Sequence, residues 1–243
     1  MGKCLFLRKG ETHTAPISGI LASDLAVGSS VYLMENGTAA EYLVVHQGLP
    51  SSMYDESCNG CYLLRKDLYG KRQWHSSDSN SYKASTIHSY LNSTFLGLFD
   101  SDIQAAIKEV KIPYVNGTGV SAVASGANGL AAKIFLLSGY EVGFTTSVSY
   151  GFPVDGAKLD YFESGSTSGG TNRAKRIAYL NGTATFWWLR SPTTDFTDLA
   201  WCVVTDGDGG DTGCSGSCGI RPALILPSTA LFDKNTLILK GVA

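Results

Sequence analysis

The chain has 243 residues, of which 44% are hydrophobic and 16% are charged, and its formal net charge is −2. This length and apolar fraction are enough for one large domain or two small ones with a substantial core. The slight negative charge, without any basic cluster, argues against nucleic acid and anionic membranes as partners.

The N-terminal residues do not form a secretory signal. The apolar run from Cys4 to Leu7 is too short for a signal core, and charged residues follow it at once. No apolar stretch approaches the length of a membrane span. We therefore expect a soluble protein that is made in a cytoplasm without a signal peptide and is not inserted in a membrane.

The first third of the chain predicts an extension followed by a β-hairpin. Residues 1–27 are small and polar with no period, and we interpret them as an N-terminal extension. After them, two apolar runs flank Asn36-Gly37, a pair that favours a hairpin turn because both residues tolerate positive φ. Residues 48–83 are polar and rich in Ser, Asp and Tyr, so we expect a surface loop there.

Two helices are expected next. Apolar residues at helical spacing run from Ile87 to Leu98, with Ser85 or Thr86 as the N-cap. A capping box and a second apolar stripe predict another helix over 100–112. The capping pair and the stripe of this second helix are Ser101 with Gln104, and Ile103, Ile107 and Val110.

Short strands fill the rest of the chain. Residues 133–144 predict a buried strand or a strand with a bend, and glycine-rich loops surround it. The short strands expected in the last third are RIAYL (176–180), FWWLR (186–190), AWCVV (200–204), GIRPALIL (219–226) and TLILK (236–240). Two helices followed by many short strands predict one α+β domain over 28–243.

The cysteines and histidines allow a metal site or a nucleophile but do not form a known motif. Cys58 and Cys61 make a CxxC, whereas Cys214 and Cys218 have the wrong spacing for a paired zinc motif. A nucleophilic thiol at Cys58 or Cys61 with His75 as base is the enzymatic alternative. No nucleophile elbow or phosphate loop accompanies it, so we expect a protein that is not an enzyme.

A stretch near the C-terminus, 205–218, is rich in Asp and Gly. Asp206, Asp208 and Asp211 invite a calcium interpretation, since oxygen-rich turns bind calcium. An EF-hand loop would need an oxygen ligand at Gly210 and a Glu at Ser217. Asp and Gly are also simply good turn residues. We expect no cofactor, and calcium remains the open alternative.

The composition of residues 193–218 is biased beyond turn chemistry. The segment holds five Thr, five Asp, five Gly and three Cys, and it contains no Lys, Arg, Glu, Gln or Met. Turn formation explains Asp and Gly, but it does not explain Phe196, Leu199 and the three cysteines among them.

The residues on either side of this segment carry a resemblance to a known family. FWWLRSP (186–192), AWCVV (200–204) and GIRPALIL (219–226) resemble the C-terminal part of C-type-lectin-like domains. More narrowly, they are similar to the variable proteins of diversity-generating retroelements and to tail-associated proteins of phages and prophages. Upstream motifs that resemble a domain of phage-type proteins in gut Firmicutes are EYLVVHQG, YLLRKDLYG, STIHSYLN and KIFLLSGYEVG.

The resemblance implies a fold and a source of the biased composition. The implied fold is C-type-lectin-like, with two helices packed on short, mainly antiparallel strands and long loops. In that family an error-prone reverse transcriptase changes adenines in codons such as AAC. Such changes cannot produce Lys, Glu, Gln, Met or Trp, and residues 193–218 lack four of these five. Trp201 is the exception and would be a fixed position.

The resemblance also implies which residues vary and which support them. The expected ligand-binding, variable residues are Thr193, Asp195, Phe196, Asp198, Leu199, Cys202, Val204, Asp206, Asp208, Gly209, Gly210, Asp211, Gly213, Cys214, Gly216 and Cys218. The expected scaffold residues are Trp187, Trp188, Arg190, Trp201 and Arg221, with Val203 and Gly207 beside them. No calcium motif of sugar-binding C-type lectins is present.

The implied function is ligand or receptor binding by a phage or prophage protein, and the alternative is a structural tail or surface protein without diversification. The expected partner is a protein or cell-surface ligand, and the chain would form a homo-oligomer or part of a particle. Residues 1–27 would be the attachment segment. The protein would be made in the bacterial cytoplasm and would end on a virion or a cell surface.

Overall fold

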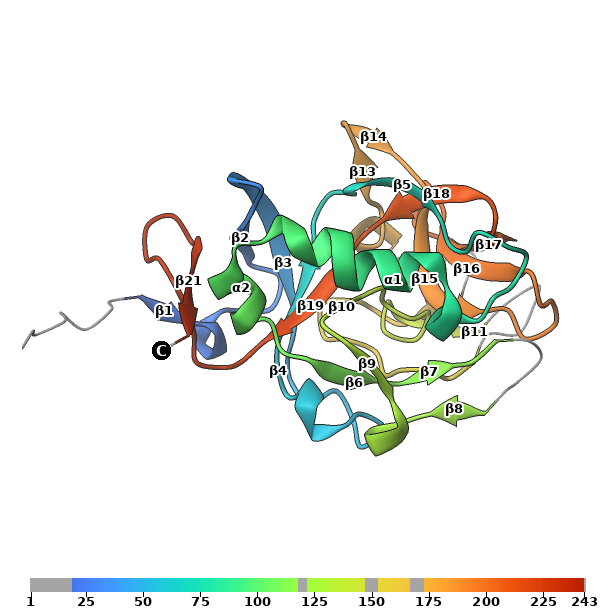
Figure 1. Ribbon diagram of the computed structural model, residues 1–243, viewed down its shortest axis with the longest axis horizontal. Coiled ribbons are helices and arrows are strands. Elements are labelled where there is room, and N and C mark those ends of the chain that lie inside the picture. Colours follow the sequence, from blue (N-terminus) through green and yellow to red (C-terminus); the bar gives the residue numbers. More distant parts are fainter. Residues whose placement is uncertain (1–18, 118–121, 147–152, 167–172, 243) are drawn as a thin grey trace, which may run out of the picture.

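The computed structural model describes residues 19–117, 122–146, 153–166 and 173–242. The expected attachment segment therefore lies mostly outside the described residues. Its last part is packed on the domain, because β1 (Ile20–Leu21) pairs with β20 (Ala230–Phe232) and Ala22 is buried. Figure 1 shows β1 and β21 (Leu239–Val242), which flank β20, at the end of the molecule where the chain finishes.

The architecture is mainly β. Strands hold 39% of the described residues, and the α-helices are the short α1 (Thr86–Tyr90) and α2 (Ser101–Ala106). The expected α+β fold of the C-type-lectin-like kind, with two helices packed on strands, is therefore wrong. The described part of the chain instead packs small β-sheets around a common core (Figure 1).

Two five-stranded sheets dominate the structure. The first has the order β10 (Ile134–Phe135), β19 (Ala223–Leu226), β4 (Gly60–Arg65), β3 (Thr38–Gly48) and β2 (Ser30–Glu35). The second has the order β17 (Gly209–Gly213), β16 (Leu199–Val203), β15 (Trp187–Pro192), β18 (Ser217–Ile220) and β5 (Gly70–Gln73). The chain passes from the second sheet to the first through Arg221 and Pro222, so the two sheets share a continuous segment.

Smaller sheets complete the fold. β1, β20 and β21 form a three-stranded sheet. The two-stranded pairs are β6 (Val110–Ile112) with β9 (Leu130–Ala132), β7 (Tyr114–Val115) with β8 (Val123–Ala124), β11 (Phe144–Thr146) with β12 (Gly165–Ser166), and β13 (Tyr179–Leu180) with β14 (Thr183–Ala184).

The expected hairpin is confirmed. β2 and β3 pair in antiparallel register up to Glu35 and Thr38, so the turn consists of Asn36 and Gly37 alone. Both residues have positive φ, 46° and 75°, as a tight hairpin turn requires. The expected surface loop over 48–83 is wrong, because it contains β4, which is buried and lies at the centre of the first sheet.

The first expected helix is confirmed in outline. α1 continues through a wide turn at Leu91–Phe95 into a tight turn at Leu96–Leu98, and the hydroxyl of Ser85 accepts the amide of His88 as the N-cap. The second is shorter than expected. Asp100 precedes α2 without a side-chain cap, and the amide of Gln104 bonds Phe99 O instead of completing a capping box.

The end of α2 explains the missing half of that helix. Ile107 is already extended, and Val110 belongs to β6, where it pairs with Ala132 of β9. Both residues are buried, but in extended backbone. The hydrogen bonds of this backbone are thus made with a partner strand and not within a helix. The helical spacing of three apolar residues therefore predicted too long a helix.

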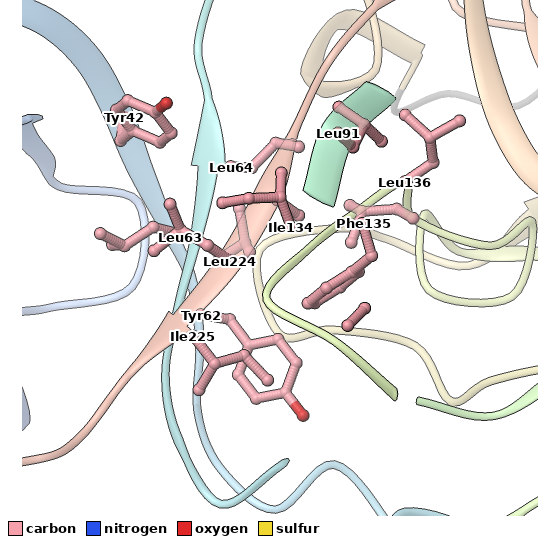
Figure 2. Close-up of a cluster of buried hydrophobic side chains, with 14 of the residues drawn as sticks. Tyr42, Tyr62, Leu63, Leu64, Leu91, Ile134, Phe135, Leu136, Leu224 and Ile225 are labelled. Carbon is pink, nitrogen blue, oxygen red and sulfur yellow. The ribbon is translucent and has the colours of Figure 1, made fainter. Parts of the chain in front are cut away.

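The core lies on both faces of the first sheet, since the consecutive residues Leu63 and Leu64 of β4 are both buried, and the helical run contributes to it (Figure 2). Leu63 and Leu64 of β4 and Leu224 of β19 are fully buried there, as are Ile134 of β10 and Leu91 of the helical run. Each such side chain contributes roughly 1.5–3 kcal/mol when removed from water. No helix in the described part of the chain is long and apolar enough to cross a membrane.

Candidate functional site

The central strand of the second sheet, β15, supports the segment with the biased composition. Its Trp187 and Trp188 are fully buried. The indole nitrogen of Trp187 donates to Arg176 O at 2.9 Å, and that of Trp188 donates to Arg72 O at 2.8 Å. Both rings therefore have fixed orientations, as buried Trp requires a partner for its N–H.

Arg190, on the same strand, joins four other segments. Its guanidinium forms a two-bond pair with the carboxylate of Glu141, at 2.5 and 2.7 Å. It also donates to the main-chain oxygens of Pro113, Leu136 and Asp155 at 2.8–3.0 Å. Arg190 and Glu141 are both buried. Because all three nitrogens of the buried guanidinium donate hydrogen bonds, Arg190 holds these segments in one arrangement.

The loop after β15 is held from below by Asn80, which is fully buried. Its amide nitrogen Nδ2 lies 2.7–3.2 Å from the main-chain oxygens of Thr193, Phe196 and Leu199. Its backbone N–H donates to Thr197 O at 2.8 Å. The shape of residues 193–199 thus depends on main-chain oxygens, which any residue supplies.

Thr193 closes the same loop from its other end. Its hydroxyl lies 2.9 Å from Phe196 O and 3.1 Å from Leu199 O, and its N–H donates to Leu199 O. Thr193 is buried. It holds the loop and is not placed to contact a ligand.

The side chains at the top of the loop point to solvent. Asp195, Thr197 and Asp198 are exposed, and Phe196 has 42% of its surface exposed. An exposed phenylalanine beside two exposed carboxylates is a polar surface with one large apolar contact point.

The hairpin of β16 and β17 continues this surface. The strands pair from Leu199 with Gly213 to Val203 with Gly209. Figure 1 shows both strands at the end of the molecule far from the C-terminus.

The turn of this hairpin is fixed from outside. Arg173 Nη1 lies 3.3 Å from Asp206 and 3.0 Å from Asp208, and Arg176 Nε donates to Gly207 O at 2.7 Å. Gly207 has a φ of 87°, and a Cβ there would lie 2.3 Å from Arg173 O. Gly207 therefore has no room for a side chain, which agrees with its expected place in the scaffold.

A family model described as "Domain of unknown function (DUF6273)" matches residues 59–228. The chain belongs to the DUF6273 family. The matched range begins at β4 and ends after β19, so it contains the whole second sheet, Asn80 and residues 193–218. No curated protein and no solved structure matches the chain.

Within this DUF6273 domain, the expected variable residues fall into three groups by burial. The buried ones are Thr193, Cys202, Cys214 and Cys218, and the exposed ones are Asp195, Phe196, Asp198 and Asp206. The half-buried ones are Leu199, Val204, Asp208, Gly209, Gly210, Asp211, Gly213 and Gly216. The expected scaffold residues Trp187, Trp188, Arg190, Trp201 and Arg221 are all buried.

Further exposed residues of the same segment are not among the expected variable positions. Thr197, Thr205, Ser215 and Ser217 are exposed and adjoin the expected positions. Alternation along a strand was the criterion for inclusion, and it does not apply in the loop and turn where three of these four residues lie. A rule that included every loop residue would have found them.

The cysteines of the segment are enclosed. Burial raises the pKa of Cys214 to about 12. The thiols of Cys202 and Cys218 lie against each other, which raises the pKa of Cys202 and lowers that of Cys218. In the expected CxxC, burial raises the pKa of Cys58 to about 11 and that of Cys61 to about 12. Raised pKa values disfavour the thiolate that a nucleophile or a zinc ligand requires.

The acidic residues of the turn bind an arginine in this structure. Asp206 and Asp208 both contact Arg173, as described above. Burial raises the pKa of Asp211, which lies opposite Trp201 in the hairpin. Among the described residues, no three His, Cys, Asp or Glu side chains gather as a metal site.

Proposed function

We propose that this DUF6273 chain is a non-enzymatic binding protein that displays a variable contact surface, encoded by a phage or a prophage. We call this surface the display surface. It consists of the exposed and half-buried side chains of residues 194–199 and 204–217. The observation that carries the proposal is the way the loop is held: Asn80 and Thr193 bind main-chain oxygens, so the outward side chains can be exchanged without loss of loop shape.

The composition of the segment supports exchange. Residues 193–218 lack four of the five residue types that adenine-directed changes in AAC-type codons cannot produce. The fifth type occurs once, as Trp201, which is buried and so belongs to the support. The burial of Trp201 supports its expected role as a fixed position.

The chemistry of the surface indicates its partner. The segment carries five Asp and no Lys or Arg, and Asp195 and Asp198 are exposed. Phe196 offers a large apolar contact between them. Such a surface suits a protein or cell-surface ligand with a basic rim and an apolar pocket, because charges steer the approach and aromatic residues contribute most of the contact energy.

A structural tail or surface protein without diversification is the second candidate. The observation that favours it is the fixed hairpin turn, where Arg173 holds Asp206 and Asp208 and Gly207 has no room to change. Under this alternative the same residues would be constant for structural reasons.

Sequencing many copies of the gene and its flanks from one population distinguishes the two candidates. We expect substitutions at codons 194–198 and at Gly213, at adenines of a nearby template repeat, with a reverse transcriptase gene beside it. We expect constancy at Asn80, Thr193 and Gly207. A constant segment without such a cassette would contradict diversification and leave the structural role.

A further inference from the structure

Two buried arginines in this protein differ in their counter-charges. Arg190 pairs with the carboxylate of Glu141. Arg221 is only 2% exposed, and no carboxylate of the described residues forms an ion pair with it. The guanidinium of Arg221 bonds Arg65 O through Nε at 3.0 Å and reaches Arg176 O at 3.5 Å. It lies 5.0 Å from the ring centre of Trp187.

The lack of a counter-charge is costly for a buried cation. Buried charges in proteins are normally paired, because the loss of hydration is otherwise uncompensated. Burial lowers the pKa of Arg221 to about 10, which reflects this cost. The contacts of the guanidinium are two carbonyl oxygens and an aromatic ring, and Asp67, whose charge acts on Arg221, forms no ion pair with it.

Arg221 lines a cavity of about 200 Å³ at the protein surface. The other charged residues on its wall are Lys66, Lys175 and Asp67, so three cations face one carboxylate. Tyr161 and Tyr179 provide an aromatic wall.

Each lysine at the cavity forms an ion pair, whereas Arg221 forms none among the described residues, although the carboxylate of Asp67 lies on the same cavity wall. Lys66 Nζ lies 3.0 Å from both oxygens of Glu41, and Lys175 Nζ lies 3.3 Å from Glu163. These pairs are partly exposed. The unpaired positive charge of the cavity is thus on its most deeply buried member.

We propose that this cavity binds a small organic anion, whose carboxylate, phosphate or sulfate group is held by the guanidinium of Arg221. A guanidinium presents its donors as a planar fork that matches the oxygens of such groups. The tyrosine rings contact the body of the ligand. The volume fits one small molecule and is below that of a drug-sized pocket.

The cavity is separate from the display surface. None of its lining residues lies in 193–218. Exchange of the display surface therefore leaves the cavity unchanged, and the chain would carry one fixed specificity for an anion beside one variable specificity for a partner.

Calorimetric titration of the full chain tests this inference with three probes: glucuronate, inorganic phosphate and glucose. We expect saturable binding of glucuronate or phosphate, and the one that binds identifies the recognised group. Glucose lacks the anion and should not bind. Arg221→Gln should weaken the binding about tenfold or more, because a charge-assisted fork is lost. Lys240→Ala, a surface lysine paired with Asp233 away from the cavity lining, is the matched control and should bind as the wild type does.

Circular dichroism shows whether Arg221→Gln is folded. If it is not, the double variant Lys66→Ala/Lys175→Ala decides, since both lysines are partly exposed, and we expect it to bind several-fold more weakly. The inference is overturned if neither anion binds saturably at millimolar concentration. It is equally overturned if a folded Arg221→Gln, or the double variant in its place, binds the anion as tightly as the wild type.

Discussion

At the scale of single residues, buried charge is the feature of this protein with the largest consequences. Arg190, Glu141 and Asp155 lie within one hydrogen-bonded network and are almost wholly buried. Tyr54 donates its hydroxyl to Glu141 at 2.7 Å, and Ser191 donates to Asp155. The sequence shows these residues but not that they meet, because Glu141 and Arg190 lie 49 residues apart in the chain, in two separate motifs.

Removing one member of the buried pair should destabilise the fold strongly. Glu141→Gln leaves the Arg190 charge buried without its counter-charge, and we expect a loss of about 3–5 kcal/mol in the free energy of unfolding. The exposed pair of Lys240 and Asp233 is the comparison, and Lys240→Ala should change stability by about 1 kcal/mol or less. Urea denaturation measures both. Equal effects of the two variants would contradict the role of the Arg190 network.

Asp155 should make stability depend on pH. Burial raises its pKa to about 6, against the opposing effects of Arg190 and of the hydrogen bond from Ser191. Its folded pKa is above the unfolded value of about 4, so its contribution is complete below pH 4 and is lost as the pH rises through 6. The loss is on the order of 3 kcal/mol.

The comparison of wild type with Asp155→Asn isolates this group. We expect the stability difference between the two proteins to change from pH 4 to pH 7 in the direction that favours the variant at higher pH. Asp195→Asn, the same substitution at an exposed position, is the matched control. Chemical denaturation at each pH measures the free energy of unfolding of both proteins. If the two free energies change in parallel with pH, Asp155 does not titrate in this range.

At the scale of elements, the sequence predicted a helix or hairpin correctly where a turn or cap within the element itself determines it. The Asn36-Gly37 turn and the Ser85 cap are local, and both are found. β4 was missed because it follows a polar stretch, and only its pairing with β3 and β19 makes it a central strand. The predicted length of α2 was too great for the same reason, because Val110 pairs with Ala132 of β9.

The hairpin turn at Gly207 should be intolerant of any side chain. Gly207→Ala places a Cβ against Arg173 O at 2.3 Å and in a left-handed backbone conformation. Gly182→Ala is a matched control, with a φ of 78° but no atom within 4 Å of its Cβ. We expect a loss of about 1 kcal/mol at Gly182 from backbone strain alone, and a clearly larger loss at Gly207. Thermal or urea unfolding that gives equal losses would exclude the clash with Arg173 O.

At the scale of the whole molecule, the fold separates what must be constant from what is free to change. The second sheet contributes a buried layer of Trp187, Trp188 and Arg190, and the loop and hairpin at its edge carry the exposed side chains. All five residues that the sequence analysis expected in the scaffold are buried, and their constancy stays a prediction. The sequence did not predict that Thr193 and the three cysteines are buried too, because burial depends on Asn80 and on strands distant in the sequence.

The overall architecture was not predictable from the patterns available. Most of the described strands have two to six residues. Such short strands have too few positions for an alternation of apolar and polar residues to identify them. Apolar residues near the helical run gave a stronger periodic signal than the strands did, and this favoured an α+β interpretation over the mainly β structure found.

The central claim is that the loop of the display surface, residues 194–199, keeps its shape without its own side chains, because Asn80 and Thr193 hold its main-chain oxygens. The most direct test compares the free energy of unfolding of two variants with that of the wild type. One replaces Asp195, Phe196, Thr197 and Asp198 together by Ala, and the other is Asn80→Ala. We expect the fourfold variant to stay within about 1 kcal/mol of the wild type, because all four side chains are exposed and the bonds that hold the loop go to its main-chain oxygens. Asn80→Ala should lose about 1–3 kcal/mol, because it removes a buried donor from Thr193 O and one of the donors of Phe196 O and Leu199 O. The opposite order, with the fourfold variant destabilised and Asn80→Ala unchanged, would contradict the account.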